Sequence, residues 1–97
     1  MAASNKPELS LLDTGSSLKT LQISAMAGMI MPLHHATKET VIVVQEGTAL
    51  LKMPNAEHVL NKGLSFIIPA LVEHTLVVKT DFKAIAIMAA DSEIEFI

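Results

Sequence analysis

The sequence predicts an all-β domain, and three observations support this prediction. Short runs rich in aliphatic and β-branched residues recur along the chain, and in several of them polar residues occupy every second position. Residues common in turns separate these runs. No segment longer than about ten residues combines helical periodicity with a capping signal. Short strands at regular spacing are typical of a β-sandwich or a barrel, and we therefore predict one of these architectures.

The individual strands follow from local patterns. Residues 20–25 alternate polar and apolar side chains, which predicts a strand with one polar face. Residues 41–44 are all β-branched, and Gly47 follows that run. Residues 48–53 alternate again, and Pro54 then favours a turn. The full set of expected strands is 20–25, 41–46, 48–53, 58–60, 64–69, 73–78, 82–89 and 94–97.

The length and composition indicate one folded domain. The chain has 97 residues, of which 51% are hydrophobic and only 18% are charged, so it is rich enough in apolar residues to bury a core. We expect residues 1–97 to form a single domain, with residues 1–8 as a flexible N-terminal segment.

The excess of apolar side chains predicts a homodimer. Runs such as 41–44 and 76–78 are apolar on both faces, and one of those faces needs a cover other than the domain's own core. The apolar C-terminal residues Ile94, Phe96 and Ile97 add to this surface. A second copy of the chain, related by a two-fold axis, would bury it.

Charge and missing residue types exclude several function classes. The net charge is −3 and all seven cations are lysines, so the chain offers neither arginine to clamp a phosphate nor a positive surface for nucleic acid. The N-terminal residues lack the apolar run of a signal peptide, and no run reaches the length that spans a membrane. Together with the lack of cysteine, these features predict a cytoplasmic protein without nucleic-acid or membrane partners.

Residues 28–47 resemble the first motif of the cupins, which places a glycine, a His-x-His pair, a glutamate and a second glycine at fixed spacing. Five residues separate Gly28 from His34, and six separate Thr40 from Gly47, as in that motif. Ala36 stands where the second histidine of the family would be, and Thr40 where its glutamate would be. His34 is thus the one metal ligand of this motif that the sequence retains.

Residues 63–74 resemble the second cupin motif, which supplies one more histidine. Five residues separate Gly63 from Pro69, and two separate Leu71 from His74, as in the family, although Leu71 replaces a glycine. The two motifs together resemble those of a small, single-domain cupin. The resemblance implies a double-stranded β-helix, the jelly-roll barrel of RmlC-like cupins, with its site inside the barrel.

Strand alternation then places the histidines. In a regular strand His34 faces the barrel interior, whereas His35 faces outward together with Leu33 and Met31. His34 and His74 are therefore expected to face each other across a ligand pocket.

A distorted strand leaves an alternative open. A bulge that turns His35 inward would give a three-nitrogen metal set of His34, His35 and His74, which Glu39 could join. Two imidazoles by themselves hold a divalent ion weakly. We therefore expect no tightly bound metal cofactor. If a divalent metal ion occupies the site in part of the molecules, the candidates are Zn, Ni, Fe and Mn.

Two functions fit these residues. The first, which we favour, is a binding or sensing module without enzymatic activity, for a small, largely apolar ligand with one or two hydrogen-bond acceptors. The alternative is a metal-dependent enzyme similar to cupin dioxygenases or isomerases, which needs the set His34, His35 and His74. Five methionines are expected in the core and not as the lining of a pocket: Met26, Met29, Met31, Met53 and Met88.

Overall fold

The computed structural model of the chain describes residues 6–97, and these form ten strands and no helix. The all-β prediction is confirmed. The strands are β1 (Glu8–Thr14), β2 (Leu18–Ala25), β3 (Ile30–Ala36), β4 (Thr40–Glu46), β5 (Thr48–Met53), β6 (Ala56–Asn61), β7 (Ser65–Ile68), β8 (His74–Val78), β9 (Phe82–Ala89) and β10 (Ile94–Phe96).

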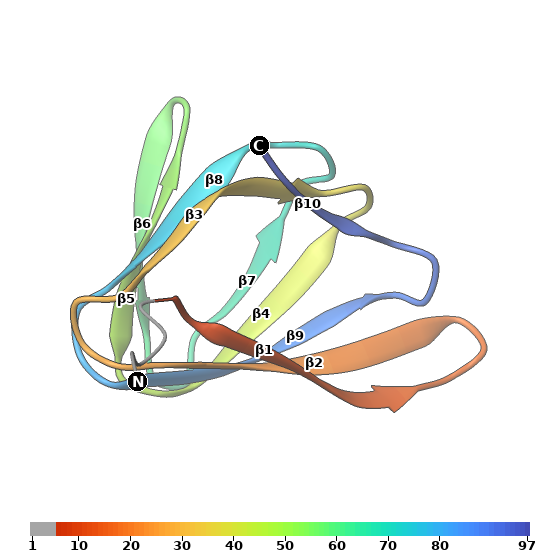
Figure 1. Ribbon diagram of the computed structural model, residues 1–97, viewed down its shortest axis with the longest axis horizontal. Coiled ribbons are helices and arrows are strands. Elements are labelled where there is room, and N and C mark those ends of the chain that lie inside the picture. Colours follow the sequence, from red (N-terminus) through yellow and green to blue (C-terminus); the bar gives the residue numbers. More distant parts are fainter. Residues whose placement is uncertain (1–5) are drawn as a thin grey trace, which may run out of the picture.

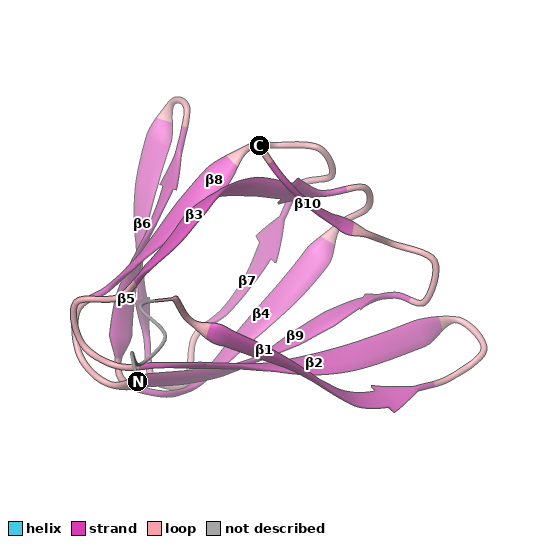
Figure 2. Ribbon diagram, viewed as in Figure 1, coloured by secondary structure: helices cyan, strands magenta, loops and turns pink. Residues whose placement is uncertain are grey.

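The strands form two five-stranded antiparallel sheets that face each other (Figure 1, Figure 2). The first, which we call sheet A, has the order β1-β2-β9-β4-β7, and the second, sheet B, has the order β10-β3-β8-β5-β6. Strands that are far apart in the sequence are neighbours in both sheets, as when β9 lies between β2 and β4. This interleaving is the jelly-roll arrangement of a double-stranded β-helix.

Two strands were missing from the expected set: β3, where a regular strand was assumed only to place His34 and His35, and β1. Glu8 begins this strand, so the expected flexible segment 1–8 overlaps it at that residue, and residues 1–5 lie outside the described part of the chain. β1 pairs with β2, and the register shifts between Leu11 and Asp13. The extra residue breaks the alternation of polar and apolar side chains, which is why the pattern did not reveal this strand.

The core lies between the sheets and follows the alternation of the strands. In β4 and β9 every second side chain is buried, and the residues between them face outward. Phe82, Leu51 and Leu60 are the largest apolar side chains that are almost fully buried. These side chains fix the two sheets face to face, since each sheet contributes to one shared hydrophobic cluster.

Gly47 joins β4 to β5, and this turn lies against the turn that precedes β9. Its φ of +82° lies in the left-handed region, and a Cβ at this position would overlap the carbonyl oxygen of Asp81. Only glycine satisfies both conditions. The second glycine of the first motif therefore holds the β4–β5 turn against the start of β9.

Candidate functional site

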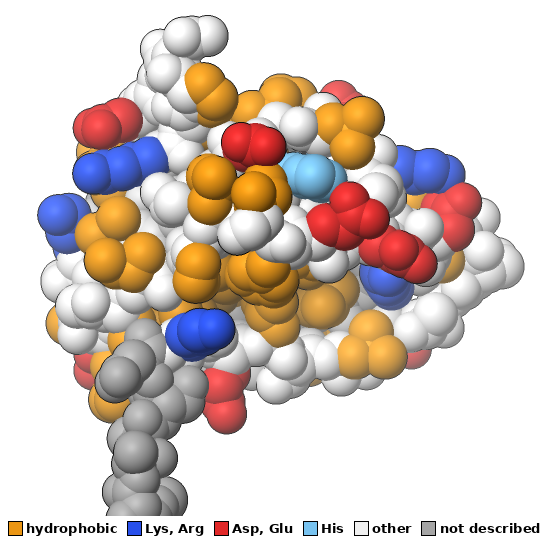
Figure 3. Space-filling model, turned by 45° about the horizontal axis from the view of Figure 1, so that its top comes forward, with side chains coloured by type: hydrophobic (Ala, Val, Ile, Leu, Met, Phe, Trp, Pro, Cys, Tyr) orange, Lys and Arg blue, Asp and Glu red, His pale blue; other side chains and the backbone are white. Residues whose placement is uncertain are grey.

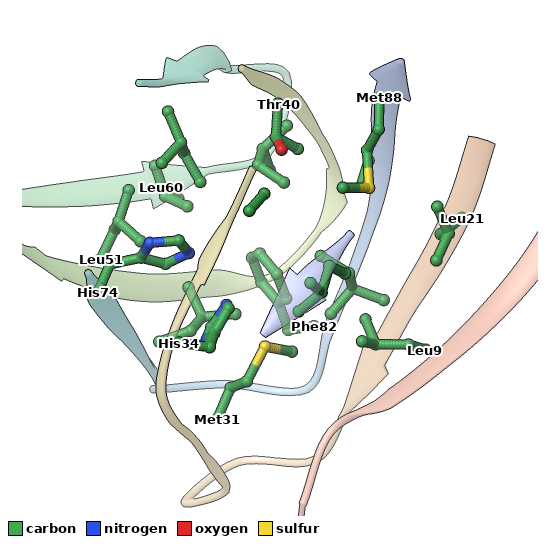
Figure 4. A pocket seen from close by; sticks show the side chains of 17 residues that line it. Leu9, Leu21, Met31, His34, Thr40, Leu51, Leu60, His74, Phe82 and Met88 are labelled. Atoms are coloured by element: carbon green, nitrogen blue, oxygen red, sulfur yellow. The ribbon is translucent and has the colours of Figure 1, made fainter. Parts of the chain in front are cut away.

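A small cavity lies between the two sheets, with a volume of about 50 Å³. Its wall is apolar and includes side chains of both sheets, among them Met31, Phe82 and Met88 (Figure 4). Three of the lining residues have polar side chains: His34, Thr40 and His74. The cavity is thus an apolar chamber with a few polar groups.

The cavity opens to solvent near the edges of the two sheets. Leu9 of β1, Leu21 of β2 and Ile94 of β10 line it and are only half-buried, whereas the deeper lining residues are buried. Figure 3 shows recessed hydrophobic side chains near the middle of the molecular surface. Phe96 of β10 is a further apolar side chain near the cavity, because the centroid of its ring lies 5.1 Å from that of His34.

His34 and His74 meet because their strands are paired. His34 of β3 lies directly opposite His74 of β8, and cross-strand partners hold their side chains within contact distance. The two ring centroids are 4.1 Å apart, with 63° between the ring planes. Both side chains are buried, at 6% and 5% exposure. The expected pair of facing histidines is present in the cavity.

Backbone carbonyl groups fix the tautomer of both rings. Nδ1 of His34 lies 2.6 Å from the oxygen of Pro32, and Nδ1 of His74 lies 2.9 Å from the oxygen of Val72. A carbonyl oxygen can only accept, so each Nδ1 carries the hydrogen and donates it. In a neutral ring this leaves Nε2 with a free lone pair, and neither Nε2 has a hydrogen-bond partner within residues 6–97.

Burial keeps both rings neutral. It is the main reason why the pKa of His34 is lowered from 6.5 to about 4; the hydrogen bond to Pro32 opposes this shift, and the neighbouring His74 and His35 add to it. Burial also lowers the pKa of His74, against the hydrogen bond to Val72. Near neutral pH the cavity therefore presents two hydrogen-bond acceptors. From the sequence we expected a ligand with acceptors, whereas a group that pairs with these free nitrogens has to be a donor.

His35 lies on the other face of β3. Its Nε2 is 2.8 Å from Oε1 of Glu95, the residue opposite it on β10, and its side chain does not line the cavity. Because Nε2 donates to the carboxylate, Nδ1 of the neutral ring is the acceptor, and it is buried without a partner among the described residues. Glu39 is exposed beyond the end of β3.

The structure therefore does not assemble the alternative metal set. It brings His34 and His74 together and leaves His35 and Glu39 outside the cavity. Within residues 6–97 no three histidine or carboxylate side chains are close enough to hold a metal ion.

A bulge in β3 changes which side chains face inward. Met31 lies opposite Leu76 and His34 lies opposite His74, so three steps along β3 match two steps along β8. The extra residue turns Met31 inward, where it is buried and lines the cavity. The prediction that Met31 faces outward with His35 was wrong for this reason. Pro32 was a signal for it, because a proline inside a strand often marks a bulge.

The methionines divide between three environments. Met31 and Met88 are buried and line the cavity, Met29 and Met53 pack partly buried against the core, and Met26 is 57% exposed. The expectation of core positions thus failed for Met26, which lies just beyond the end of β2, and the expectation that methionines do not line a pocket failed for Met31 and Met88.

The residues present do not fit the divalent metal site that the motifs imply. Ala36 and Thr40 are buried and line the same cavity as His34 and His74, so they occupy the inner positions where the other two ligands would be. A methyl group cannot coordinate an ion, and a neutral hydroxyl does not supply the charge of a carboxylate. Half of the donor set is missing.

The second motif keeps its backbone shape without its glycine. Leu71 has a φ of 65°, the only positive φ among the described non-glycine residues, at the position where cupins carry glycine. Its N–H donates to the carbonyl oxygen of Ala36 over 2.8 Å. The loop before β8 is therefore held at the end of β3 despite the strain of a left-handed leucine.

Comparisons with known proteins agree with this geometry at the level of the fold. No protein-family model matches the sequence, and no curated protein matches it either. Among solved structures, a cupin superfamily protein from Desulfitobacterium hafniense is similar, with 19% identity over 94% of this chain and 84% of that one and a TM-score of 0.80.

Two further structures extend the comparison. An uncharacterised protein with a double-stranded β-helix domain from Klebsiella pneumoniae has 15% identity over 98% of this chain and 89% of that one, with a TM-score of 0.81. A DMSP lyase from Ruegeria pomeroyi has 19% identity and a TM-score of 0.82, and the match covers 94% of this chain but 51% of that one. The chain has the fold of a small cupin, as the motifs predicted. No helix capable of crossing a lipid bilayer is present in residues 6–97.

Proposed function

We propose that the protein is a binding or sensing module for a small, largely apolar ligand that carries a hydrogen-bond donor. The observation that supports this most is the pair of neutral imidazoles, whose free Nε2 atoms are available inside an otherwise apolar cavity. Ligand sites commonly combine an apolar wall with a few placed polar groups. Here the wall supplies affinity, and His34 and His74 supply orientation.

The cavity limits the size of the ligand. About 50 Å³ is available, whereas one water molecule needs roughly 10–15 Å³ on this measure. The site therefore accepts a molecule of a few non-hydrogen atoms, or the end of a longer chain that leaves through the opening near Leu9 and Ile94.

The charge of the wall limits the chemistry of the ligand. None of the lining residues is a lysine or a carboxylate, so a charged group would be buried without an opposite charge. Phosphorylated sugars are accordingly not expected to bind. Short alcohols and similar neutral donors fit the site.

A comparison of matched ligands tests the proposal. In thermal unfolding and calorimetric titration, short-chain alcohols should bind, and ethers of the same size, which lack the donor, should bind more weakly. Replacing both rings by side chains without an acceptor, in the H34L/H74L variant, should remove this preference, whereas H35L, on the opposite face, should retain it. Equal binding of alcohols and ethers, or strong stabilisation by nucleotide sugars, would overturn it.

The alternative, a metal-dependent enzyme that uses His34, His35 and His74, has less support. It would require β3 to rotate His35 away from Glu95 and into the interior, at the cost of the 2.8 Å hydrogen bond between them. No observation in the described residues favours that rearrangement.

The outer face of sheet A supports the proposal of a homodimer. Val41 lies between Ile67 and Ile87 on the neighbouring strands, and Val43 lies beside Ile85, so five aliphatic side chains form a continuous patch. None of them is buried, and Ile67 is 56% exposed. Two copies that pair these faces around a two-fold axis would cover the patch.

Light scattering after size exclusion tests the dimer. We expect the wild type to have twice the chain mass of 10.4 kDa at micromolar concentration. The V43K/I85K variant should be monomeric, and V59K, which changes the outer face of sheet B, should remain a dimer. A wild type that elutes as a stable monomer would refute this part of the proposal.

A further inference from the structure

A thioether lies in the same cavity as the two imidazoles. The bulge in β3 turns Met31 inward on the strand that carries His34, and both side chains line the cavity. Figure 4 shows the sulfur of Met31 drawn beside the ring of His34, with the ring of His74 on the same side of the cavity. Met88, the other methionine that lines the cavity, lies opposite Thr40 and away from the histidines in this view.

The two histidines are oriented as metal-bound histidines are. A histidine that binds a metal through one ring nitrogen usually donates the hydrogen of the other to a backbone carbonyl or a carboxylate, which fixes the ring. His34 and His74 each make this bond, to Pro32 and Val72. Both Nε2 atoms are thus unprotonated and available without rearrangement.

The donor set is neutral and partly soft. It combines two imidazole nitrogens with a thioether, and no carboxylate lines the cavity. Thioether sulfur selects Cu(I) over the harder divalent ions, and imidazole also binds copper. Zinc, by contrast, is normally held by four ligands or by three and a water.

The apolar wall favours an ion with a single charge. The cost of moving an ion out of water grows with the square of its charge, so a dication costs about four times as much as a monocation of the same size. A cavity without an anionic side chain cannot offset the larger cost. Ala36 and Thr40 stand where the family has a histidine and a glutamate. The absence of these two ligands disfavours a divalent ion and leaves a site suited to a soft monovalent ion.

We infer that His34, His74 and Met31 form a binding site for a soft monovalent metal ion of the Cu(I) class. Two Nε2 atoms and one sulfur provide the low coordination number that such an ion accepts. The inference goes beyond the proposed function, because it assigns a metal ion to the cavity and does not depend on an organic ligand binding there.

Competition for Cu(I) tests the site. The 97-residue chain is titrated without oxygen against a chromophoric Cu(I) chelator, and Ag(I) is used as a probe that does not change oxidation state. We expect one equivalent of Cu(I) per chain, held on the order of a hundredfold more tightly than Zn²⁺. Ag(I) should shift the methyl resonance of Met31 and leave that of the exposed Met26 unchanged.

Matched variants assign the ligands. M31L is close in volume and should fold, and it should weaken Cu(I) binding about tenfold or more, because only the thioether is lost. M88L removes the other cavity thioether and should bind within about twofold of the wild type. H34Q/H74Q should lose binding, and the thermal unfolding of each metal-free variant shows that it is folded.

Several results would overturn the inference. These are a wild type that yields all its Cu(I) to the chelator, an M31L variant that binds as the wild type does, loss of binding in M88L instead, and tighter binding of Zn²⁺ than of Cu(I). The response to alcohols and ethers is measured separately in metal-free protein. Failure of the metal site therefore leaves the proposed ligand-binding function untouched, and the reverse also holds.

Discussion

His34 and His35 are adjacent in the sequence and lie on one strand, yet their environments are opposite. His34 is buried in the cavity, donates from Nδ1 to a backbone carbonyl and has a pKa lowered to about 4. His35 lies on the outer face of sheet B, donates from Nε2 to Glu95 and leaves its side chain 18% exposed. The face of the strand, and not the type of residue, decides what each imidazole can do.

The difference also shows that the fold is compatible with an incomplete set of metal ligands. The cavity side of β3 keeps His34 and Ala36 at the inner positions of the motif, while the outer side keeps an ordinary cross-strand pair. Both sides are compatible with the same backbone. The predictions below test how far the two sides differ, in order of decreasing effect.

Restoring the missing ligands should have the largest effect. The A36H/T40E variant adds a histidine and a carboxylate at positions that already line the cavity, so it should gain affinity for Ni²⁺ or Zn²⁺ on the order of a hundredfold or more over the wild type. Each single substitution should give a smaller gain, because the two donors act on one ion. Titration against a competing chelator measures the gain.

The outer histidine provides the control for that experiment. Adding H35A to A36H/T40E should leave the metal affinity unchanged, since His35 faces away from the cavity. A double variant that binds no better than the wild type would show that positions 36 and 40 do not converge with His34 and His74. Loss of binding on removing His35 would show that β3 is rearranged around the ion.

Acid should destabilise the protein through the cavity side. Because the folded state lowers the pKa of His34 and His74 below 6.5, the unfolded chain binds protons more readily than the folded one. The stability that the neutral ring of His34 provides is complete above about pH 6.5 and is lost as the pH falls toward about 4, and His74 acts in the same direction. His34 should contribute up to about 1.4 kcal/mol per pH unit in this window.

Urea unfolding at a series of pH values between 7 and about 5 measures this slope, above the range in which most carboxylates titrate. The H34Q/H74Q variant should have lower stability at pH 7 and a flatter dependence. An unchanged slope in this variant would mean that other groups cause the acid sensitivity.

The outer pair should contribute little. A double-mutant cycle of H35A and E95A should give a coupling of about 0.2–1 kcal/mol, because Glu95 is 53% exposed and solvent screens the pair. H34A, by comparison, leaves a cavity and should cost about 2 kcal/mol or more. A coupling well above 1 kcal/mol for the outer pair would contradict the expectation that the outer face of β3 contributes less to stability than the cavity face.

The smallest expected effect is a gain. L71G removes the strain of a leucine at φ 65° but increases the freedom of the unfolded chain, so we expect a net stabilisation of about 0.5 kcal/mol. Its N–H bond to Ala36 at the end of β3 should persist, which amide hydrogen exchange can follow. Destabilisation would indicate that the exposed leucine side chain makes a favourable contact that outweighs its backbone strain.

The sequence by itself determined the fold class, because alternation of side chains and turn residues are local features that each strand carries alone. The spacing of Gly28, His34, Gly47 and His74 was sufficient to predict the cupin fold. Alternation also placed His34 inside and His35 outside, since neighbouring side chains of a strand point to opposite faces.

Only the tertiary structure decided the details of the cavity. The bulge that turns Met31 inward depends on the register between β3 and β8, which pairs residues from distant parts of the chain. The free Nε2 atoms depend on where the carbonyls of Pro32 and Val72 point, and the lowered pKa of His34 depends on the sheet that covers it. Register, hydrogen-bond direction and burial are relations between strands, so no single stretch of sequence contains them.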